Sequence, residues 1–331
     1  MIEDFGQMPD GRPVQRLRLI GGGLTAHVLT YGTVLQDLRL EGHGAPLVLG
    51  FPEFASYLAH SRYFGATAGR CANRIRDGHL ELDGQTYRLD RNFLGKHSLH
   101  GGAASMGKQL WTLEDHALHW AAFTIVLEDG HMGYPGRLEA RVTYALLPGG
   151  VFDVQMEAAT DAPTLCNMAH HSYWCLDGSG SVAHHLLQVD ADSYLPVDGE
   201  LIPTGEVAPV AGTGFDFRSP AKVSQAGPLF DHNFCLSRRR GLIRPVARLT
   251  SPASGISLEL RTTEPGLQVY GGGKLGAPVP GLTGAQIGPH AGIALEPQVW
   301  PDANHHPDFP QAVLRPGETY RQHTQFKISK D

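Results

Sequence analysis

The strongest constraint on the fold is an alternation of apolar and polar residues with a period of two, which recurs along nearly the whole chain. Residues 79–89 form two alternating runs around an Asp-Gly pair at 83–84, and residues 138–160 repeat this pattern around a Pro-Gly-Gly turn at 148–150. Successive side chains of a strand point to opposite faces, so each run predicts a strand with one buried face. Asp-Gly between two such runs is a strong hairpin signal.

The same pattern continues at 255–260 and 320–328, whereas helical periodicity is weak and its best candidate is the short stretch 52–60. The 41 glycines and 23 prolines make up about 19% of the 331 residues, above the usual combined share of about 12%. This excess is typical of a chain with many turns. No linker or low-complexity segment divides the chain. The sequence therefore predicts an all-β fold, a large antiparallel β-sandwich, with residues 1–331 forming a single domain.

Charge and composition exclude several classes of partner. A net charge of −6 and a pI near 6.3 disfavour nucleic acid and anionic membranes. The apolar run 121–127, among the longest, is too short to span a bilayer. The four cysteines form no Cys-x-x-Cys motif, and the N-terminus lacks the apolar stretch of a secretory signal. We therefore expect a cytoplasmic protein with reduced thiols.

Eighteen histidines are a large number, so a metal site must be considered. The sequence contains neither a His-Glu-x-x-His motif nor a cysteine pair at metal-ligand spacing. Because adjacent strand residues face opposite ways, His170 and His171 could hardly hold one ion together. We predict no metal, and we place the histidine pairs at 184–185 and 305–306 on the surface.

Four short segments combine hydrogen-bonding side chains with aromatic residues, at 69–75, 97–102, 167–174 and 295–302. Sugar hydroxyls are bound by planar polar groups such as those of Arg, Asn, Asp and Gln, while the C–H face of a sugar ring packs on an aromatic side chain. The composition of the four segments therefore indicates a sugar site. Trp300 is a candidate for the aromatic wall.

These segments also carry a family resemblance. The chain resembles the aldose 1-epimerase (galactose mutarotase) family in eight stretches that occur in the family's order. They are YFGATAGRCANRI (63–75), SLHGG (98–102), GYPG (133–136), HHSYW (170–174), FDHNF (230–234), TTEPGLQVY (262–270), LEPQVWPDANHHPDFP (295–310) and LRPGETY (314–320). The resemblance covers about residues 12–329 and implies the family's fold, an antiparallel β-supersandwich.

The resemblance also assigns roles to individual residues. It implies that His171 is the general acid and Glu296 the general base, with no metal or other cofactor. It further implies a monosaccharide substrate and five sugar-binding residues: Asn73, Arg74, His100, Asp231 and Gln268. The sequence departs from the family pattern around His171, where His170 replaces a common Asn, Ala169 a Thr, Trp174 a Phe and Cys175 an Asn, and also at Pro297.

This pair suits the chemistry of anomer exchange. A base takes the proton of the C1 hydroxyl while an acid protonates the ring oxygen, and the open aldehyde rotates and closes again. Glutamate is ionised at neutral pH, and histidine, with a pKa of about 6.5, can carry the proton. The sequence leaves open whether His100 shares the acid role, which aldose is preferred (galactose, glucose or a pentose), and whether the protein is a monomer or a homodimer.

Three alternative functions remain at this point. A hexose-6-phosphate 1-epimerase would need cations for the phosphate, and Arg238, Arg239 and Arg240 are the candidates. A catalytically silent sugar-binding protein could use the same fold, although retention of both His171 and Glu296 argues against it. A glycosidase would need two carboxylates across the scissile bond, and only Glu296 and Asp231 are apparent.

Overall fold

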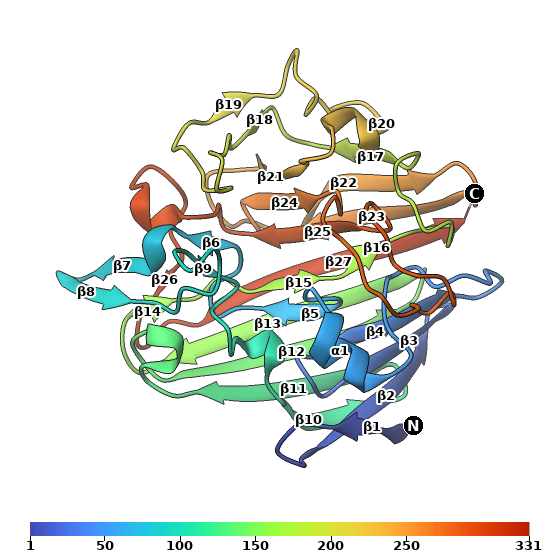
Figure 1. The fold of residues 1–331 in the computed structure, drawn as a ribbon, viewed down its shortest axis with the longest axis horizontal. Helices are drawn as coiled ribbons and strands as arrows, with labels where there is room; N and C mark the ends of the chain where they lie inside the picture. The colour runs from blue at the N-terminus through green and yellow to red at the C-terminus, as the bar shows by residue number, and fades with distance from the viewer. Residues whose placement is uncertain (331) are drawn as a thin grey trace.

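The computed structural model describes residues 1–330, and its regular secondary structure is almost entirely antiparallel β-strand (Figure 1). In this part of the chain the one α-helix is α1 (Phe54–His60), which lies inside the predicted helical stretch. Five short 3-10 turns complete the helical content, at Arg76–Gly78, Met106–Lys108, His131–Gly133, Val223–Ala226 and Ala303–His305. The prediction of an all-β fold is confirmed.

The largest sheet has nine strands in the order β10-β11-β12-β13-β27-β23-β22-β17-β20. It contains the predicted hairpin at 138–160, in which Leu138 lies opposite Thr160, and the predicted strands near 255–260 and 320–328. Its strands are β10 (Thr112–Ala117), β11 (Trp120–Leu127), β12 (Leu138–Leu147), β13 (Val151–Thr160), β27 (Tyr320–Lys330), β23 (Ile256–Thr262), β22 (Arg244–Ser251), β17 (Leu186–Val189) and β20 (Ala221–Lys222).

Two smaller sheets cover this large sheet. A six-stranded sheet has the order β16-β25-β24-β21-β18-β19, and a four-stranded sheet joins β1 to β4 in sequence. The first contains β16 (Tyr173–Trp174), β25 (Ile293–Gln298), β24 (Gly266–Tyr270), β21 (Asp231–Cys235), β18 (Ser193–Tyr194) and β19 (Ala208–Pro209). The second contains β1 (Ile2–Gln7), β2 (Pro13–Gly21), β3 (Leu24–Leu29) and β4 (Leu35–Leu40).

Four two-stranded pairs complete the fold. They are β15 (Ala169–His171) with β5 (Ala66–Ala68), β6 (Arg74–Ile75) with β9 (Ser98–Leu99), β7 (His79–Leu82) with β8 (Gln85–Arg88), and β14 (Thr164–Leu165) with β26 (Val313–Leu314). The β7–β8 pair is the hairpin predicted from the Asp-Gly motif. Asp83 and Gly84 both have positive φ, at 52° and 77°, as a tight hairpin turn requires.

The core explains why the sheets form layers. In β12 alternate residues are buried, so one face of the nine-stranded sheet is apolar along its length. Val142 and Phe326 on that sheet belong to the same buried cluster as Val28 of β3 and Leu295 of β25. The large sheet therefore packs against both smaller sheets, which confirms the predicted sandwich.

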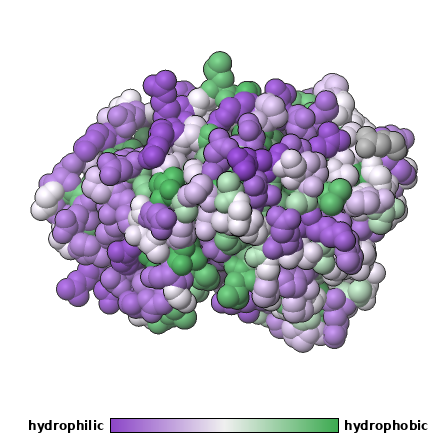
Figure 2. Space-filling model, turned by 90° about the horizontal axis from the view of Figure 1, so that it is seen from above, coloured by the Kyte–Doolittle hydropathy of each residue, from purple (hydrophilic) through white to green (hydrophobic). Residues whose placement is uncertain are grey.

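The outer surface is mainly polar. Hydrophilic residues cover most of the face seen in Figure 2, and hydrophobic residues occur there in small separate groups. Among residues 1–330, no helix has the length and apolar character needed to cross a membrane. The four cysteines are free thiols, and three of them are buried.

Candidate active site

One wall of the candidate site is a face of the six-stranded sheet. Gln268 of β24 lies opposite both Glu296 of β25 and Asn233 of β21. Cross-strand partners share a face, and so do residues two apart along one strand. The register therefore places Asp231, two residues before Asn233, on the same face as Gln268 and Glu296. It also brings Tyr173 there, because Tyr173 is paired with a residue two positions before Glu296.

The opposite wall comes from the two-stranded pairs. His171 ends β15, where it is paired with Ala66 of β5, and Arg74 of β6 lies opposite Leu99 of β9. His100 follows directly. Its backbone N–H donates to the Asn73 carbonyl oxygen at 2.9 Å, and its Nδ1 accepts from the Asn73 backbone N–H at 3.2 Å. Two segments distant in sequence are thus held edge to edge beside His171.

A cavity of about 360 Å³ lies between the two walls, within the size range of small-molecule sites. All seven residues singled out from the sequence line it: Asn73, Arg74, His100, His171, Asp231, Gln268 and Glu296. Four aromatic side chains also line it, namely Tyr63, Phe93, Tyr173 and Tyr270. The cavity therefore combines the polar groups and the flat apolar surfaces that a sugar ring requires.

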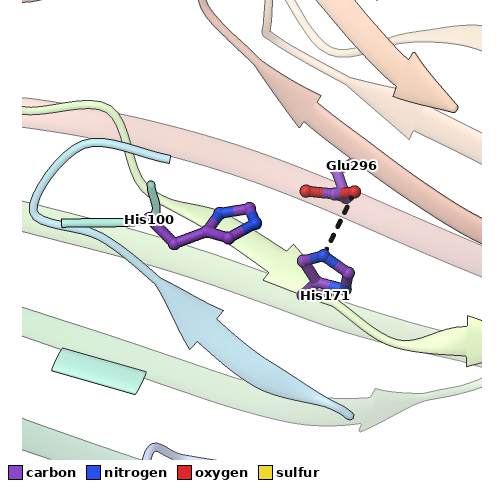
Figure 3. Close-up of side chains that lie close together, drawn as sticks. All are labelled: His100, His171 and Glu296. Atoms are coloured by element: carbon purple, nitrogen blue, oxygen red, sulfur yellow. Dashed lines mark ion pairs between the residues drawn. The ribbon is translucent and has the colours of Figure 1, made fainter. Parts of the chain in front are cut away.

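The two proposed proton-transfer groups face each other in this cavity. His171 Nε2 lies 3.4 Å from Glu296 Oε1, and both side chains are almost completely buried (Figure 3). The His100 ring lies edge-on to the His171 ring, with 5.2 Å between their centroids. Glu296 Oε2 and His171 Nδ1 are buried without a hydrogen-bond partner in the protein. Polar groups of this kind are available to a ligand.

Burial controls the protonation of the pair. It raises the pKa of Glu296 well above its usual value, an effect that the nearby Asp231 carboxylate reinforces and Arg74 opposes. Burial also lowers the pKa of His171, to about 4. In the ligand-free site, burial therefore favours the form of the pair in which a neutral carboxyl, holding one proton, lies beside a neutral imidazole. An ionised glutamate beside an imidazolium would hold the same single proton.

A second network lies beside the pair. Asp231 accepts a hydrogen bond from Gln268 Nε2 at 2.6 Å on one oxygen and from Arg74 Nη2 at 3.1 Å on the other. The Arg74 guanidinium also stacks over the Phe93 ring, 4.7 Å from its centroid. Asp231, Arg74 and Gln268 therefore hold one another in place and present a fixed set of donors and acceptors to the cavity.

The sequence is similar to known proteins along nearly its whole length. The family model for aldose 1-epimerase matches residues 15–327. Galactose mutarotase of Sus scrofa is 41% identical over 336 residues, which cover 98% of this chain and 97% of that protein. Aldose 1-epimerase of Escherichia coli is 34% identical, covering 97% of this chain and 96% of its own length. The chain belongs to the aldose 1-epimerase family.

Solved structures agree with this assignment. An aldose epimerase homologue from C. elegans superposes with a TM-score of 0.90 at 31% identity, covering 95% of this chain and 98% of that one. A galactose 1-epimerase from Lactobacillus acidophilus gives a TM-score of 0.87 at 27% identity, covering 100% and 98%. The protein is therefore an isomerase that interconverts the α and β anomers of aldoses.

Hydrogen bonding of His100 bears on metal binding in this aldose 1-epimerase. His100, His171 and Glu296 each offer an atom within 4.8 Å of the others, a geometry that a metal ion could use. However, neutral His100 accepts a hydrogen bond at Nδ1, so its proton is on Nε2 and it presents a donor to the cavity. Two ligands then remain, fewer than the three protein ligands typical of a catalytic zinc site.

Four residues that line the cavity have left-handed backbone conformations although none is glycine. Tyr63, Asn73, His100 and Leu201 have φ values of 61°, 62°, 52° and 64°. Such conformations cost about 1–3 kcal/mol each when the residue is sparsely tolerated there, and they concentrate at functional sites. The aldose 1-epimerase thus holds these four cavity-lining residues in backbone conformations that an ordinary strand would not give.

Three aromatic residues of the cavity are not predicted from the sequence, and one candidate residue lies outside the cavity. Tyr63, Phe93 and Tyr270 were not identified, although Tyr270 stands two residues after Gln268 and so shares its face. Trp300, a candidate for the aromatic wall, does not line the cavity. It is buried in a separate cluster, its Nε1 donates to the Pro265 carbonyl oxygen at 2.9 Å, and its ring packs on Phe309.

One further expectation needs correction, and the phosphate alternative loses its first candidates. His185 was expected at the surface but is buried, and its Nε2 accepts from the Leu176 backbone N–H. The arginines at 238–240 do not line the cavity, because Arg238 stacks on Trp300 and Arg240 pairs with the buried Glu264. A phosphate on the substrate would not meet them. As expected, His170 and His171 point to opposite sides of their strand, since only His171 reaches the cavity.

Proposed function

We propose that Glu296 and His171 are the general base and general acid of this aldose 1-epimerase. The observation that carries the proposal is their direct apposition, at 3.4 Å, in a buried cavity of the right size for a sugar. The sugar would lie with its C1 hydroxyl against Glu296 and its ring oxygen against His171. Each positioned proton transfer of this kind accelerates a reaction by roughly 10²–10⁴-fold.

Ring opening would consume the charges of the pair. The Glu296 carboxylate takes the C1 hydroxyl proton, the C1–O1 double bond forms, and the bond between C1 and the ring oxygen breaks as His171 gives that oxygen its proton. This leaves a neutral carboxyl and a neutral imidazole. After rotation about C1–C2, the reverse transfers close the ring on the other face and restore both charges.

Burial favours the neutral form of the pair, which is the form present while the aldehyde is open. A buried ion pair without further partners is costly. We infer that sugar hydroxyls stabilise the charged pair just enough to start the reaction, and that desolvation then assists ring opening. A site open to water would stabilise the charged state and lose this advantage.

The remaining polar residues would bind the sugar hydroxyls. His100 would donate from Nε2, and the interlocked Arg74, Asp231 and Gln268 would fix the orientation of the ring. Asn73 would act mainly by holding His100, since its own side-chain oxygen accepts from the Arg74 backbone N–H at 2.8 Å. This arrangement supports His171 as the acid and gives His100 a binding role.

Galactose is the substrate we propose first, because the mammalian relatives are named galactose mutarotase and match nearly the full length of the chain. Glucose and pentoses such as xylose and arabinose are further candidates. A hexose 6-phosphate remains a second candidate substrate, but its phosphate would be bound by residues other than Arg238, Arg239 and Arg240. Arg62, Lys108 and Lys274 line the cavity, and none of them forms an ion pair within residues 1–330.

Polarimetry of freshly dissolved α-D-galactose, α-D-glucose and glucose 6-phosphate tests the proposal. We expect the protein to accelerate relaxation to the same final rotation, most strongly with galactose. Sugar binding without acceleration would identify a silent binder, and a preference for glucose 6-phosphate would move the assignment to the phosphorylated substrate. Release of an aryl alcohol from an aryl galactoside would point to a glycosidase instead.

Glu296→Gln tests the base directly, because the amide keeps the shape of the side chain but has no basicity. We expect kcat to fall by roughly 10²–10⁴-fold while KM stays within a few fold. Glu41→Gln is the matched control, since Glu41 is exposed and forms no ion pair in the described chain. Equal activity of the two variants would remove Glu296 from the mechanism.

Three wider properties stay proposals. We propose that residues 1–331 act as a single domain, since one buried cluster spans the nine-, six- and four-stranded sheets. We propose a cytoplasmic location, which the four free cysteines support. Function as a monomer is consistent with a cavity lined by one chain, and gel filtration at micromolar concentration would separate a monomer from a homodimer.

A further inference from the structure

A second, basic hollow lies outside the sugar cavity, on the β7–β8 hairpin. The hairpin register places His79 opposite Arg88 and Glu81 opposite Thr86. Cross-strand partners share a face, so His79, Arg88 and Thr86 lie together on one side. Glu81 lies on the same side, with its Oε1 3.7 Å from His79 Nε2. Leu80 on the other side is buried, which directs the polar face away from the core.

Residues from three further segments surround this face. The hollow encloses about 440 Å³ and is lined by Arg76, Asp77, Gly78, His79, Thr86, Arg88, Arg91 and His305. Three arginines and two histidines thus line the hollow with one carboxylate, Asp77, in a chain whose net charge is −6. Glu81 pairs with His79 from outside this lining, and Asp302 pairs with Arg76 and His305. The sugar cavity and the basic hollow have no lining residue in common.

Two of these arginines have no internal partner. Arg76 is bound within the protein, because its Nη2 donates to the Pro203 carbonyl oxygen and its Nε lies 3.5 Å from Asp302 Oδ2. Arg88 and Arg91 are exposed and form neither an ion pair nor a side-chain hydrogen bond with residues 1–330. The like charges of these two unpaired arginines repel each other. An anion would remove this repulsion.

The Arg91 side chain also has a defined resting place. Gly78 has a φ of 56°, and a Cβ added there would lie 3.0 Å from Arg91 Cγ and 3.5 Å from Arg91 Nε. A side chain at position 78 would therefore displace Arg91 from the floor of the hollow. The absence of a side chain at Gly78 lets the guanidinium lie against the backbone.

We propose that the basic hollow is a binding site for a phosphate group, carried either as inorganic phosphate or as a small phosphomonoester. Arg88 and Arg91 would each present a planar fork of N–H donors, which matches the oxygens of a phosphate. The Thr86 hydroxyl would supply a further donor. The proposal does not depend on the roles assigned to Glu296 and His171.

Phosphate binding to the intact protein tests the proposal. Inorganic phosphate is titrated by calorimetry at constant ionic strength, with galactose present at saturating concentration to occupy the sugar cavity. The test variant is Arg88→Ser/Arg91→Ser. The control is Arg239→Ser/Arg248→Ser, which removes the same charge from two exposed arginines elsewhere. Mutarotation by each variant verifies that it is folded and active.

We expect saturable binding to the wild type and to the control, and binding about tenfold weaker or worse in the test variant. Glucose 6-phosphate, titrated in the same way, separates the two sources of the phosphate. Tighter binding than inorganic phosphate would indicate a phosphomonoester ligand. Absence of saturable binding to the wild type, or equal weakening in both double variants, would refute the proposal.

Discussion

Replacement of His170 by Asn should make the protein's stability less sensitive to acid. His170 is buried between the Tyr144 hydroxyl, 3.2 Å from its Nδ1, and Ser172 Oγ, 2.7 Å from its Nε2. Burial, aided by the neighbouring His171, lowers the pKa of His170 to about 3. In the unfolded chain the same group titrates near its ordinary value of about 6.5.

The sign and size of the effect follow from these two pKa values. Between about pH 6.5 and pH 3 the unfolded state binds a proton that the native state does not, so acid favours unfolding. Each pH unit in this window costs about 1.4 kcal/mol of the free energy of unfolding. Lowering the pH from 7.5 to 5.0 crosses about 1.5 units of the window, which removes about 2 kcal/mol through His170 alone.

Urea unfolding followed by tryptophan fluorescence at pH 7.5 and 5.0 measures this difference. His170→Asn should be less stable at pH 7.5 by about 1–3 kcal/mol, because hydrogen bonds to Tyr144 and Ser172 are disturbed. The difference in the free energy of unfolding between the wild type and His170→Asn should shrink by about 2 kcal/mol at pH 5.0, since asparagine does not titrate. The other buried ionisable groups contribute to both proteins and cancel in the comparison.

His116→Asn serves as the control, because His116 is exposed and its replacement should leave the pH dependence unchanged. A stability gap between the wild type and His170→Asn that stays constant from pH 7.5 to 5.0 would refute the reasoning. It would mean that native His170 gains its proton as readily as the unfolded chain does. Mutarotation should persist in His170→Asn, since the side chain faces away from the cavity.

Three further predictions concern the site. In the pH profile of kcat/KM, the acid limb should lie well below pH 6.5, near 4. The pair gains its second proton only when His171 is protonated, and burial lowers the pKa of His171. A limb at pH 6.5 would contradict this effect of burial. Activity should survive exhaustive EDTA treatment, since His100 presents an N–H donor to the cavity and so cannot coordinate a metal ion. Loss of activity that zinc restores would show that the enzyme uses a metal. Arg74→Lys should raise the KM for galactose about tenfold with less effect on kcat, because lysine lacks the planar guanidinium that stacks on Phe93 while it holds Asp231. An unchanged KM would exclude this binding role.

The sequence predicted the strands well because strand formation depends on local pattern. Residues 79–89 and 138–160 carry their own alternation and turn residues, and both became the expected hairpins. The eight family stretches likewise pointed to the residues that line the cavity. Residue type was less informative where tertiary packing decides the position of a side chain. Trp300 has the flat aromatic ring that a sugar-binding wall needs, but this ring lies in a core cluster.

The sequence alone thus determined the all-β class, the hairpins and the set of polar residues at the site. Only the tertiary structure decided how they meet, because register and layer packing depend on contacts between segments far apart in the chain. The 3.4 Å approach of His171 to Glu296 joins β15 to β25, and the left-handed backbone at Asn73 and His100 directs their side chains inward. The depth of burial that shifts both pKa values likewise arises only when the sheets close over the pair.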